Sequence, residues 1–448
     1  MLLTSSAYFI FLSALFLLYW PIARWRLACI SLLLFANYFF YAKWDLFYLA
    51  LIPAASLVDY LVGRGLGRAQ QPAIRRLLLG VSIAGNIGLL ATFKYFPNQL
   101  SPVGPFPIGL SFYAFQALSY TLDVYRRDAQ PIASLLSYFT AVSFFPTTLA
   151  GPITRPASLA PQLDRVKLLL PIDGGRALFL IGLGMAKKYL IADYLAENLV
   201  NRVFDTPNLY TGFEALMAVY AYALQLYYDF SGYTDVAIGS ALLLGLKLPA
   251  NFNAPYVSQH LAEFWRRWHI TLSNWLRDYV YFSFPGLRGK KMPYLALIAT
   301  MLVGGIWHGA SWNFLIWGAL HGIGLAIVRA WQQVVKRPIP AIPAVFLTFH
   351  FVCLAWIFFR ASTLEAAFQI LQRIGSLTFS AANVSWPVVL VLTVGALAHF
   401  IPSGWFEKTK ELFATRPFYV QAAALMLLIV GLQYVAATGA APFIYTKF

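Results

Sequence analysis

Apolar stretches repeat along the whole chain, and short polar segments separate them. An α-helix rises ~1.5 Å per residue, so about 20 apolar residues are needed to cross the hydrocarbon core of a membrane. Some of the stretches are shorter than this, which makes their number an upper estimate of the true membrane spans. The stretches lie near residues 8–22, 27–42, 45–63, 77–96, 134–150, 177–196, 211–229, 233–246, 294–306, 308–331, 341–359, 386–402 and 418–437.

This pattern predicts an all-α polytopic membrane protein, with about 11 membrane helices and additional re-entrant or interfacial helices. We expect one integral membrane domain over residues 1–448. The segment 97–125 is expected to be re-entrant or interfacial, because prolines break its first part and prevent a regular helix from starting there. These prolines are Pro97, Pro102, Pro105 and Pro107.

Composition and charge support the membrane class. Of the 448 residues, 60% are hydrophobic and 11% are charged, whereas soluble proteins carry about 25% charged residues. The aromatic content of 17% argues against a disordered chain. The net charge of +16 would suggest nucleic acid in a soluble protein. In a membrane protein, basic residues collect in cytoplasmic loops and face anionic lipid, so we expect membrane lipid and no nucleic acid as a partner.

The basic clusters and the cysteines add two further expectations. Lys187 with Lys188 forms one of the basic clusters, most of which should be cytoplasmic, and the densest cluster spans 263–291. Cys29 and Cys353 lie in apolar stretches without metal-ligand spacing, so we expect them to be packing residues.

Residues 263–282 predict an amphipathic helix at 3.6 residues per turn. His269 lies at the seam between an aromatic stripe and a basic side. The helix either lies on the membrane interface, or is packed into the protein with its arginines facing an anionic donor such as a nucleotide-bearing thioester. The aromatic stripe contains Trp265, Trp268, Leu272, Trp275 and Tyr279. The opposite side contains Glu263, Arg266, Arg267, Asn274, Arg277 and Asp278.

Two histidines, His308 and His321, stand in the uncharged apolar stretch 303–324. An ionisable side chain at membrane depth is costly and usually marks a functional cavity. The alternative is a histidine that hydrogen-bonds a neighbouring helix, and this alternative is stronger for His321. On one straight helix the two rings would be ~20 Å apart, so they could not share a metal ion, and we expect no metal site.

The chain lacks the glycine-flanked serine of a nucleophile elbow and the phosphate-binding Gly-rich loop. A general base without a covalent nucleophile is what remains, and His308 is the candidate, because burial favours a neutral imidazole that can accept a proton. Asp229 and Asp235 lie in another apolar stretch. They are expected to orient a histidine, to pair an arginine from 266–277 or to form a structural ion pair. His260, His350 and His399 are expected to be structural or interfacial.

Several ordered motifs between about residues 100 and 325 resemble the membrane-bound O-acyltransferase (MBOAT) family. They resemble in particular its bacterial branch of alginate and peptidoglycan O-acetylation proteins. The central motifs are Trp265-Arg-Arg-Trp-His269, Arg277-Asp278-Tyr279, Trp307-His308-Gly309 with Trp312, and His321-Gly322. The upstream motifs are Pro107-Ile-Gly-Leu-Ser-Phe112 with Gln116, Asp123-Val-Tyr125, Phe145-Pro146 leading to Gly151-Pro152, Asp229-Phe-Ser-Gly-Tyr-Thr-Asp235 and Pro249-Ala-Asn-Phe-Asn253.

The resemblance implies a helical bundle with opposed cytoplasmic and extracytoplasmic funnels. It implies that His308 is the essential histidine and His269 the second one, with no bound cofactor. The implied donor is a cytoplasmic acyl thioester, acetyl-coenzyme A above all. The stretch 282–292 departs from the loop usual in polysaccharide-modifying members, so the contact made there is open. Together with the local patterns, the expected donor-binding residues are Trp265, Arg266, Arg267, Trp268, Asn274, Arg277, Asp278, Trp307, Trp312 and Asp229.

The expected function is transfer of an acyl group, most simply acetyl, across the bacterial inner membrane. The acceptor is a hydroxyl of a cell-surface polysaccharide or of a periplasmic partner transferase. Two alternatives stay open. The first is a transporter or channel, because intramembrane histidines also serve proton relays. The second is D-alanyl-type transfer with a carrier-protein donor.

Overall fold

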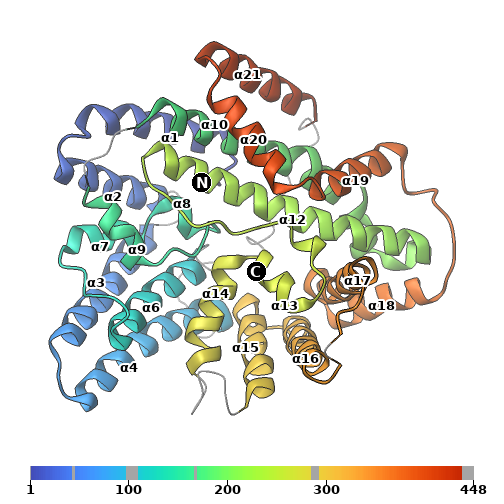
Figure 1. Ribbon diagram of the computed structural model, residues 1–448, viewed down its shortest axis with the longest axis horizontal. Coiled ribbons are helices and arrows are strands. Elements are labelled where there is room, and N and C mark those ends of the chain that lie inside the picture. The colour runs from blue at the N-terminus through green and yellow to red at the C-terminus, as the bar shows by residue number, and fades with distance from the viewer. Residues whose placement is uncertain are drawn as a thin grey trace. The chain divides into compact units, whose positions relative to one another are not determined.

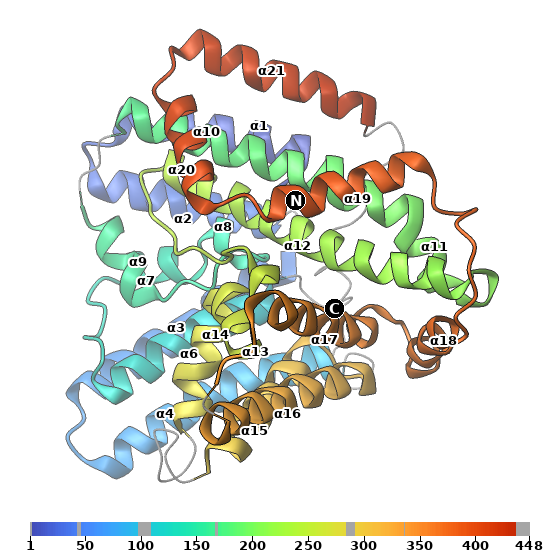
Figure 2. The same ribbon diagram turned by 45° about the vertical axis from the view of Figure 1, so that its right-hand side comes forward.

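The computed structural model describes residues 2–42, 46–96, 109–165, 169–283, 292–335 and 337–435 (Figures 1 and 2). All regular structure in these ranges is helical, and none of their residues forms a strand. The predicted all-α class is therefore confirmed. The proline-rich part of the predicted re-entrant segment, 97–108, and most of the departing loop, 284–291, lie outside these ranges.

The chain divides into two compact units, Met1–Ile181 with Tyr233–Ala250, and Gly182–Gly232 with Asn251–Phe448. Two long elements, α10 (Pro171–Ala186) and α12 (Gly212–Leu243), contribute to both units. The single domain over residues 1–448 stays a prediction. The first unit further contains α1 (Ser6–Tyr19), α2 (Arg26–Ala42), α3 (Leu46–Arg68), α4 (Pro72–Leu90), α6 (Leu110–Arg126), α7 (Leu135–Val142), α8 (Phe145–Thr148) and α9 (Pro156–Leu163).

Helix α6 forms the second part of the segment 97–125, and the re-entrant or interfacial placement of this segment stays a prediction. Residues Leu110–Arg126 form a regular helix that is buried along most of its length, beside α3 and α4 in both views (Figures 1 and 2). The last of the four prolines, Pro107, precedes this helix. The helix therefore begins beyond the prolines that interrupt the first part of the segment.

A buried polar cluster links these three helices. Asp59 of α3 is 1% exposed. It accepts hydrogen bonds from the hydroxyl of Ser82 at 2.6 Å and from the amide of Asn86 at 2.9 Å, both on α4. The Ser82 hydroxyl also lies 2.8 Å from that of Thr121 on α6. Interhelical hydrogen bonds of this kind hold helices together where the surroundings offer no water.

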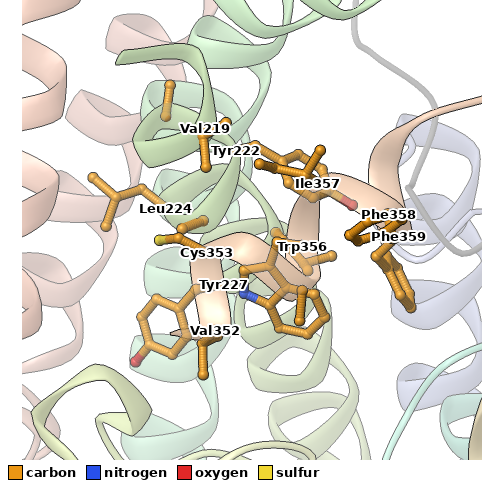
Figure 3. Packing of buried hydrophobic residues seen from close by; sticks show 14 of the residues in the cluster. Val219, Tyr222, Leu224, Tyr227, Val352, Cys353, Trp356, Ile357, Phe358 and Phe359 are labelled. Atoms are coloured by element: carbon orange, nitrogen blue, oxygen red, sulfur yellow. The ribbon is translucent and has the colours of Figure 1, made fainter. Parts of the chain in front are cut away.

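The second unit contains α11 (Asn201–Asp205), α13 (Leu261–Arg267), α14 (Ile270–Tyr279), α15 (Pro293–His308), α16 (Trp312–Val334), α17 (Ala341–Arg360), α18 (Leu364–Gly375), α19 (Trp386–His399), α20 (Ser403–Ala414) and α21 (Phe418–Val435). Its core contains side chains of α12 and α17, with Tyr222 beside Ile357 and Leu224 beside Cys353 in Figure 3. Cys29 and Cys353 are both buried, as expected of packing residues.

Helices α15 and α16 form a hairpin with a very close contact. A Cβ atom added to Gly318 would lie 2.6 Å from the carbonyl oxygen of Met301, and one added to Gly305 would collide with that of Phe314. Only glycine allows backbones to approach this closely. The glycines of the stretch 303–324 therefore bring the two helices together, on either side of a turn at 309–311.

Four helical segments in the described ranges are long and apolar enough to cross a membrane: Leu49–Arg68, Pro72–Tyr95, Trp312–Val334 and Ala341–Arg360. A bent pair, α19 with α20 at 94°, raises the count to five if it forms one span. Shorter apolar helices cover Ser6–Ile22, Arg26–Ala42, Pro293–His308 and Phe418–Gln433. These segments fit a polytopic membrane protein, and the number of about 11 membrane helices stays a prediction.

Candidate active site

The segment predicted as one amphipathic helix, 263–282, is two helices joined by a kink. Helix α13 ends at Arg267, Trp268 is extended, and α14 begins at Ile270. His269 between them is left-handed, with φ 39° and ψ 56°, a conformation that costs a non-glycine residue roughly 1–3 kcal/mol. The prediction of a continuous helix is wrong, because residues 251–253 pair with the backbone at the kink: Asn253 N–H donates to Arg267 at 2.9 Å, and Ile270 N–H donates to Asn251 at 2.9 Å.

The division of this segment into an aromatic and a polar side is nevertheless present. The stripe residues Trp265, Trp268, Leu272, Trp275 and Tyr279 are all buried. Arg266 and Arg277 are exposed. The aromatic side is thus packed into the protein, as in the second of the two alternatives.

His308 is the last residue of α15 and is 3% exposed. Three aromatic rings meet it edge to face, those of Trp307, Trp317 and Phe359, with centroids at 4.8, 5.0 and 5.0 Å. Trp317 comes from α16 and Phe359 from α17, so three helices fix the plane of the imidazole. This region, which we call the histidine region, contains His269, His308 and His321 with the aromatic rings around them.

His321 of α16 is completely buried and accepts a hydrogen bond on Nδ1 from Trp265 Nε1 at 3.3 Å. An indole nitrogen only donates, so the neutral imidazole carries its proton on Nε2. His321 thus bonds a neighbouring helix, α13, as its alternative interpretation predicted. Because the turn at 309–311 folds the chain back, Trp317 contacts both His308 and His321, each at 5.0 Å. The separation of ~20 Å between His308 and His321 assumed one straight helix, so it does not apply to this hairpin.

His269 is also completely buried. Its ring meets Phe230 of α12 edge to face at 4.7 Å, and its centroid is 6.4 Å from that of Trp307. Nδ1 lies 3.0 Å from Oδ1 of Asn251. Residues 261–279 lie outside the candidate spans, and burial lowers the pKa of His269 to about 3. The ring is therefore neutral at physiological pH, and Trp307 has ring contacts with both His269 and His308.

The predicted donor-binding residues fall into different places. Trp265 and Trp307 line the histidine region. Trp268 is buried against Phe264 and Trp356, whereas Trp312, the first residue of α16, is 71% exposed. On the polar side, Arg267 pairs with Glu263 at 2.9 Å and Arg277 with Asp278 at 2.8 Å. Arg266 is exposed, and Asn274 is half-buried. No contact described here tests donor binding by these residues, so their role stays a prediction.

Asp229 takes part in a buried ion cluster. The ammonium group of Lys188 lies 2.7 Å from a carboxylate oxygen of Asp193 and 2.7 Å from one of Asp229. Lys188 is 2% exposed. Asp229 therefore forms an ion pair, as one alternative predicted, but its partner is Lys188. Lys188, a member of one of the predicted basic clusters, is thus held inside the protein by two carboxylates, and the cytoplasmic placement of that cluster stays a prediction.

Sequence reasoning missed several residues around the site. Asn251 stood in a quoted motif without a role, and Trp317 and Phe359 were not singled out. His399 was expected to be structural or interfacial, and it is buried and accepts a hydrogen bond from Tyr256 N–H at 3.0 Å. Lys188 and Asp59 had a usable signal, because each is a charged residue inside an apolar stretch. The residues that contact His269 and His308 had no such signal in the sequence, since those contacts depend on distant segments of the chain.

The comparisons with known proteins agree with this picture. Residues 41–366 match the model of the membrane-bound O-acyltransferase family. The chain is 39% identical over 415 residues to the probable alginate O-acetylase AlgI of Azotobacter vinelandii, covering 87% of this chain and 80% of that one. It is 36% identical over 382 residues to the peptidoglycan O-acetyltransferase of Helicobacter pylori, covering 76% and 72%.

A more distant relative is the teichoic acid D-alanyltransferase of Bacillus subtilis, 30% identical over 275 residues, which cover 56% of this chain and 68% of the relative. The family model spans most of the chain, including both helices of the His308 hairpin up to α17. The chain therefore belongs to the membrane-bound O-acyltransferase family and is a multi-pass membrane O-acyltransferase.

Proposed function

We propose that this protein transfers an acetyl group from a cytoplasmic thioester, acetyl-coenzyme A, across the bacterial inner membrane, with His308 as general base. The acceptor is a hydroxyl of a cell-surface polysaccharide or of a periplasmic partner transferase. The acceptor oxygen forms the new ester bond while His308 takes its proton. The thioester C–S bond then breaks, and the departing sulfur receives the proton from the imidazolium ring.

The observation that carries this proposal is the position of His308 at the end of α15, enclosed by the edges of Trp307, Trp317 and Phe359. A neutral imidazole can accept a proton from a hydroxyl, and rigid surroundings keep it in one orientation for attack. The helices α15, α16 and α17 carry no carboxylate in the described residues 293–335 and 341–360, which supports a histidine as the base.

The choice of acetyl and of an envelope acceptor is supported by the relatives, whose names specify O-acetylation of alginate and of peptidoglycan. The exposed arginines Arg266 and Arg277 offer charges suited to the phosphates of a coenzyme. An acceptor outside the cytoplasm requires a protein of the inner membrane, where a cytoplasmic donor and a periplasmic acceptor can be reached from opposite sides.

The test is the substitution His308→Ala in cells that carry the acetylated polymer. We expect base-released acetate from the polymer to fall by about 10²–10⁴-fold, the usual contribution of a general base, while the amount of inserted protein is unchanged. His350→Ala is the matched control. This histidine lies in α17 and contacts Phe346 and Tyr220, and we expect full acetylation in that variant.

Normal polymer acetylation in the His308→Ala variant contradicts the proposal. Purified protein in liposomes separates the alternatives. Release of coenzyme A thiol from acetyl-coenzyme A, dependent on a sugar acceptor and on His308, supports the proposal. Solute uptake or conductance without any thioester would instead indicate a transporter or channel. Mass spectrometry of the acceptor distinguishes acetyl from D-alanyl, the group named in the Bacillus subtilis relative.

A further inference from the structure

The segment Pro249 to Asn253 has no role in the proposed transfer, yet its backbone builds the kink that presents His269. Asn253 N–H donates to the carbonyl of Arg267 at 2.9 Å, and the carbonyl of Asn251 accepts from Ile270 N–H at 2.9 Å. The guanidinium group of Arg267 also donates to the Asn253 carbonyl at 3.2 Å. These bonds replace part of the helical pattern around residues 268 and 269, where α13 ends and α14 begins.

The side chain of Asn251 reaches into this kink and is 1% exposed. Its Oδ1 atom lies 3.0 Å from Nδ1 of His269, 3.2 Å from the backbone nitrogen of Thr271 and 2.9 Å from the Thr271 hydroxyl. The orientation of the amide follows from these contacts. A backbone N–H can only donate, so the atom that faces Thr271 must be the oxygen and not the NH₂ group.

An amide oxygen only accepts hydrogen bonds, so Nδ1 of His269 must carry a proton. In a neutral imidazole the second nitrogen, Nε2, then holds a lone pair and is an acceptor. His321 has the opposite arrangement, because its Nδ1 accepts from the indole of Trp265. The tautomer of each histidine is thus set by a partner that can only accept or only donate a hydrogen bond.

We propose that Asn251 is a positioning residue that holds His269 as the Nδ1–H tautomer, in which Nε2 is not protonated. The inference deepens the proposed acyl transfer and rests on it for its functional meaning. Trp307 precedes His308 in the chain and contacts both histidines. A His269 ring held in one tautomer and one orientation therefore keeps its contact with Trp307 fixed beside His308.

The direct test is nitrogen-15 NMR of the full-length protein in lipid nanodiscs with labelled histidine. The His269 signals are assigned by their loss in a His269→Gln variant. We expect the wild-type ring to show a protonated Nδ1 and a bare Nε2. Asn251→Leu removes the acceptor at nearly constant volume, so this pattern should be lost, and acetyl transfer should fall by about 10²-fold through misplacement of the ring.

Two variants make the test specific. Asn251→Asp replaces the amide by a carboxylate that still only accepts, so the Nδ1–H tautomer and most of the rate should be retained. Asn253→Leu makes the same change as Asn251→Leu two residues further along, at an exposed side chain, and should leave both tautomer and rate unchanged. Asn251→Asp and the wild-type spectrum keep the proposal testable even if Asn251→Leu fails to fold.

A wild-type His269 with its proton on Nε2 would overturn the inference, as would an unchanged tautomer in a folded Asn251→Leu variant. The NMR result does not depend on enzyme activity. If His308→Ala retains polymer acetylation while the Nδ1–H tautomer is observed and lost on substitution of Asn251, the proposed function fails and the assignment of the tautomer stands. If His308 proves essential and the tautomer differs, only the role of Asn251 fails.

Discussion

Asp59 in α3 and His308 in α15 are both buried in apolar helices, 1% and 3% exposed, but their neighbours are chemically different. Both oxygens of the Asp59 carboxyl receive hydrogen bonds from α4, one from Ser82 and one from Asn86. His308 is surrounded by the edges of tryptophan and phenylalanine rings. The first group joins helices through hydrogen bonds, whereas aromatic rings from three helices pack around the second.

This difference teaches that burial of an ionisable group in a membrane helix does not by itself mark a reaction site. The groups that contact the buried side chain decide which measurement its removal affects. A carboxyl with a donor at each oxygen contributes stability and is costly to remove. For His308, the proposed role as a general base predicts a larger effect on transfer than on stability. Substitutions in the two regions should therefore affect different measurements.

The largest expected effect is on activity, in the variant His308→Leu. Acetyl transfer should fall by about 10²–10⁴-fold because the base is lost. The thermal midpoint in detergent should change by little, since a swap of similar volume in a core usually costs less than about 1.5 kcal/mol. A large loss of stability with normal activity per folded molecule would remove the distinction between the two regions.

The second expected effect is on stability, in the variant Lys188→Met. It leaves Asp193 and Asp229 buried without the ammonium group that lies 2.7 Å from each. Breaking a buried ion pair in this way costs about 3–5 kcal/mol, which unfolding in denaturant would measure. The neighbouring Lys187→Met removes a cation 6.0 Å from the Tyr227 ring and should cost below about 1 kcal/mol.

Lys188→Met also tests the predicted role of Asp229 in donor binding. Converting both carboxylates to amides in the Lys188→Met background should recover part of the lost stability if the cluster is structural, as the Asp59 cluster is. If Lys188→Met keeps its stability but loses transfer activity, Asp229 takes part in the reaction. The ion cluster would then not be structural in the way the Asp59 cluster is.

The third expected effect is also on stability, in the variant Asp59→Leu. The hydroxyl of Ser82 and the amide of Asn86 would lose their shared acceptor, which costs roughly 1–3 kcal/mol for a buried group. Transfer activity per folded molecule should be retained. Thr121→Val removes only the hydroxyl 2.8 Å from Ser82 and should cost about 1 kcal/mol. Loss of transfer activity in stable Asp59→Leu protein would show that the first unit also takes part in the reaction.

The sequence could predict those features that depend on local pattern. Apolar stretches predict the all-α class, because an α-helix forms its backbone hydrogen bonds within one segment and so needs no partner strand in a membrane. His308 stood out because it is a histidine in an uncharged stretch. The aromatic stripe from Trp265 to Tyr279 was predicted from helical periodicity, and its residues are buried.

The features that could not be predicted depend on contacts between distant segments. The kink at His269 requires the backbone of Asn251, which lies 18 residues earlier, and no local rule places a left-handed residue there. Phe359 reaches His308 from α17. Lys188 was within reach of local reasoning, since a lysine inside an apolar stretch needs a partner, but it was grouped with the loop cations because Lys187 precedes it.

The smallest expected effect concerns Glu263 on the polar side of α13, outside both buried regions. Its carboxylate accepts hydrogen bonds from Gln259 N–H and from Arg267, each at 2.9 Å. Burial acts to raise the pKa of Glu263, but these hydrogen bonds outweigh it and lower the pKa below its ordinary value of 4.5.

A carboxyl with a lowered folded-state pKa stabilises the protein above its unfolded-state pKa, and the contribution disappears as the pH falls through the folded-state value. Glu263→Gln should therefore destabilise by at most about 1 kcal/mol near neutral pH, the usual scale for partly exposed pairs, and the difference from wild type should vanish as the pH falls below the folded-state pKa. Paired urea titrations at several pH values would measure this. A difference that persists at low pH would mean that Glu263 acts through packing, and α13 would then depend on its polar side as much as on Trp265 and Trp268.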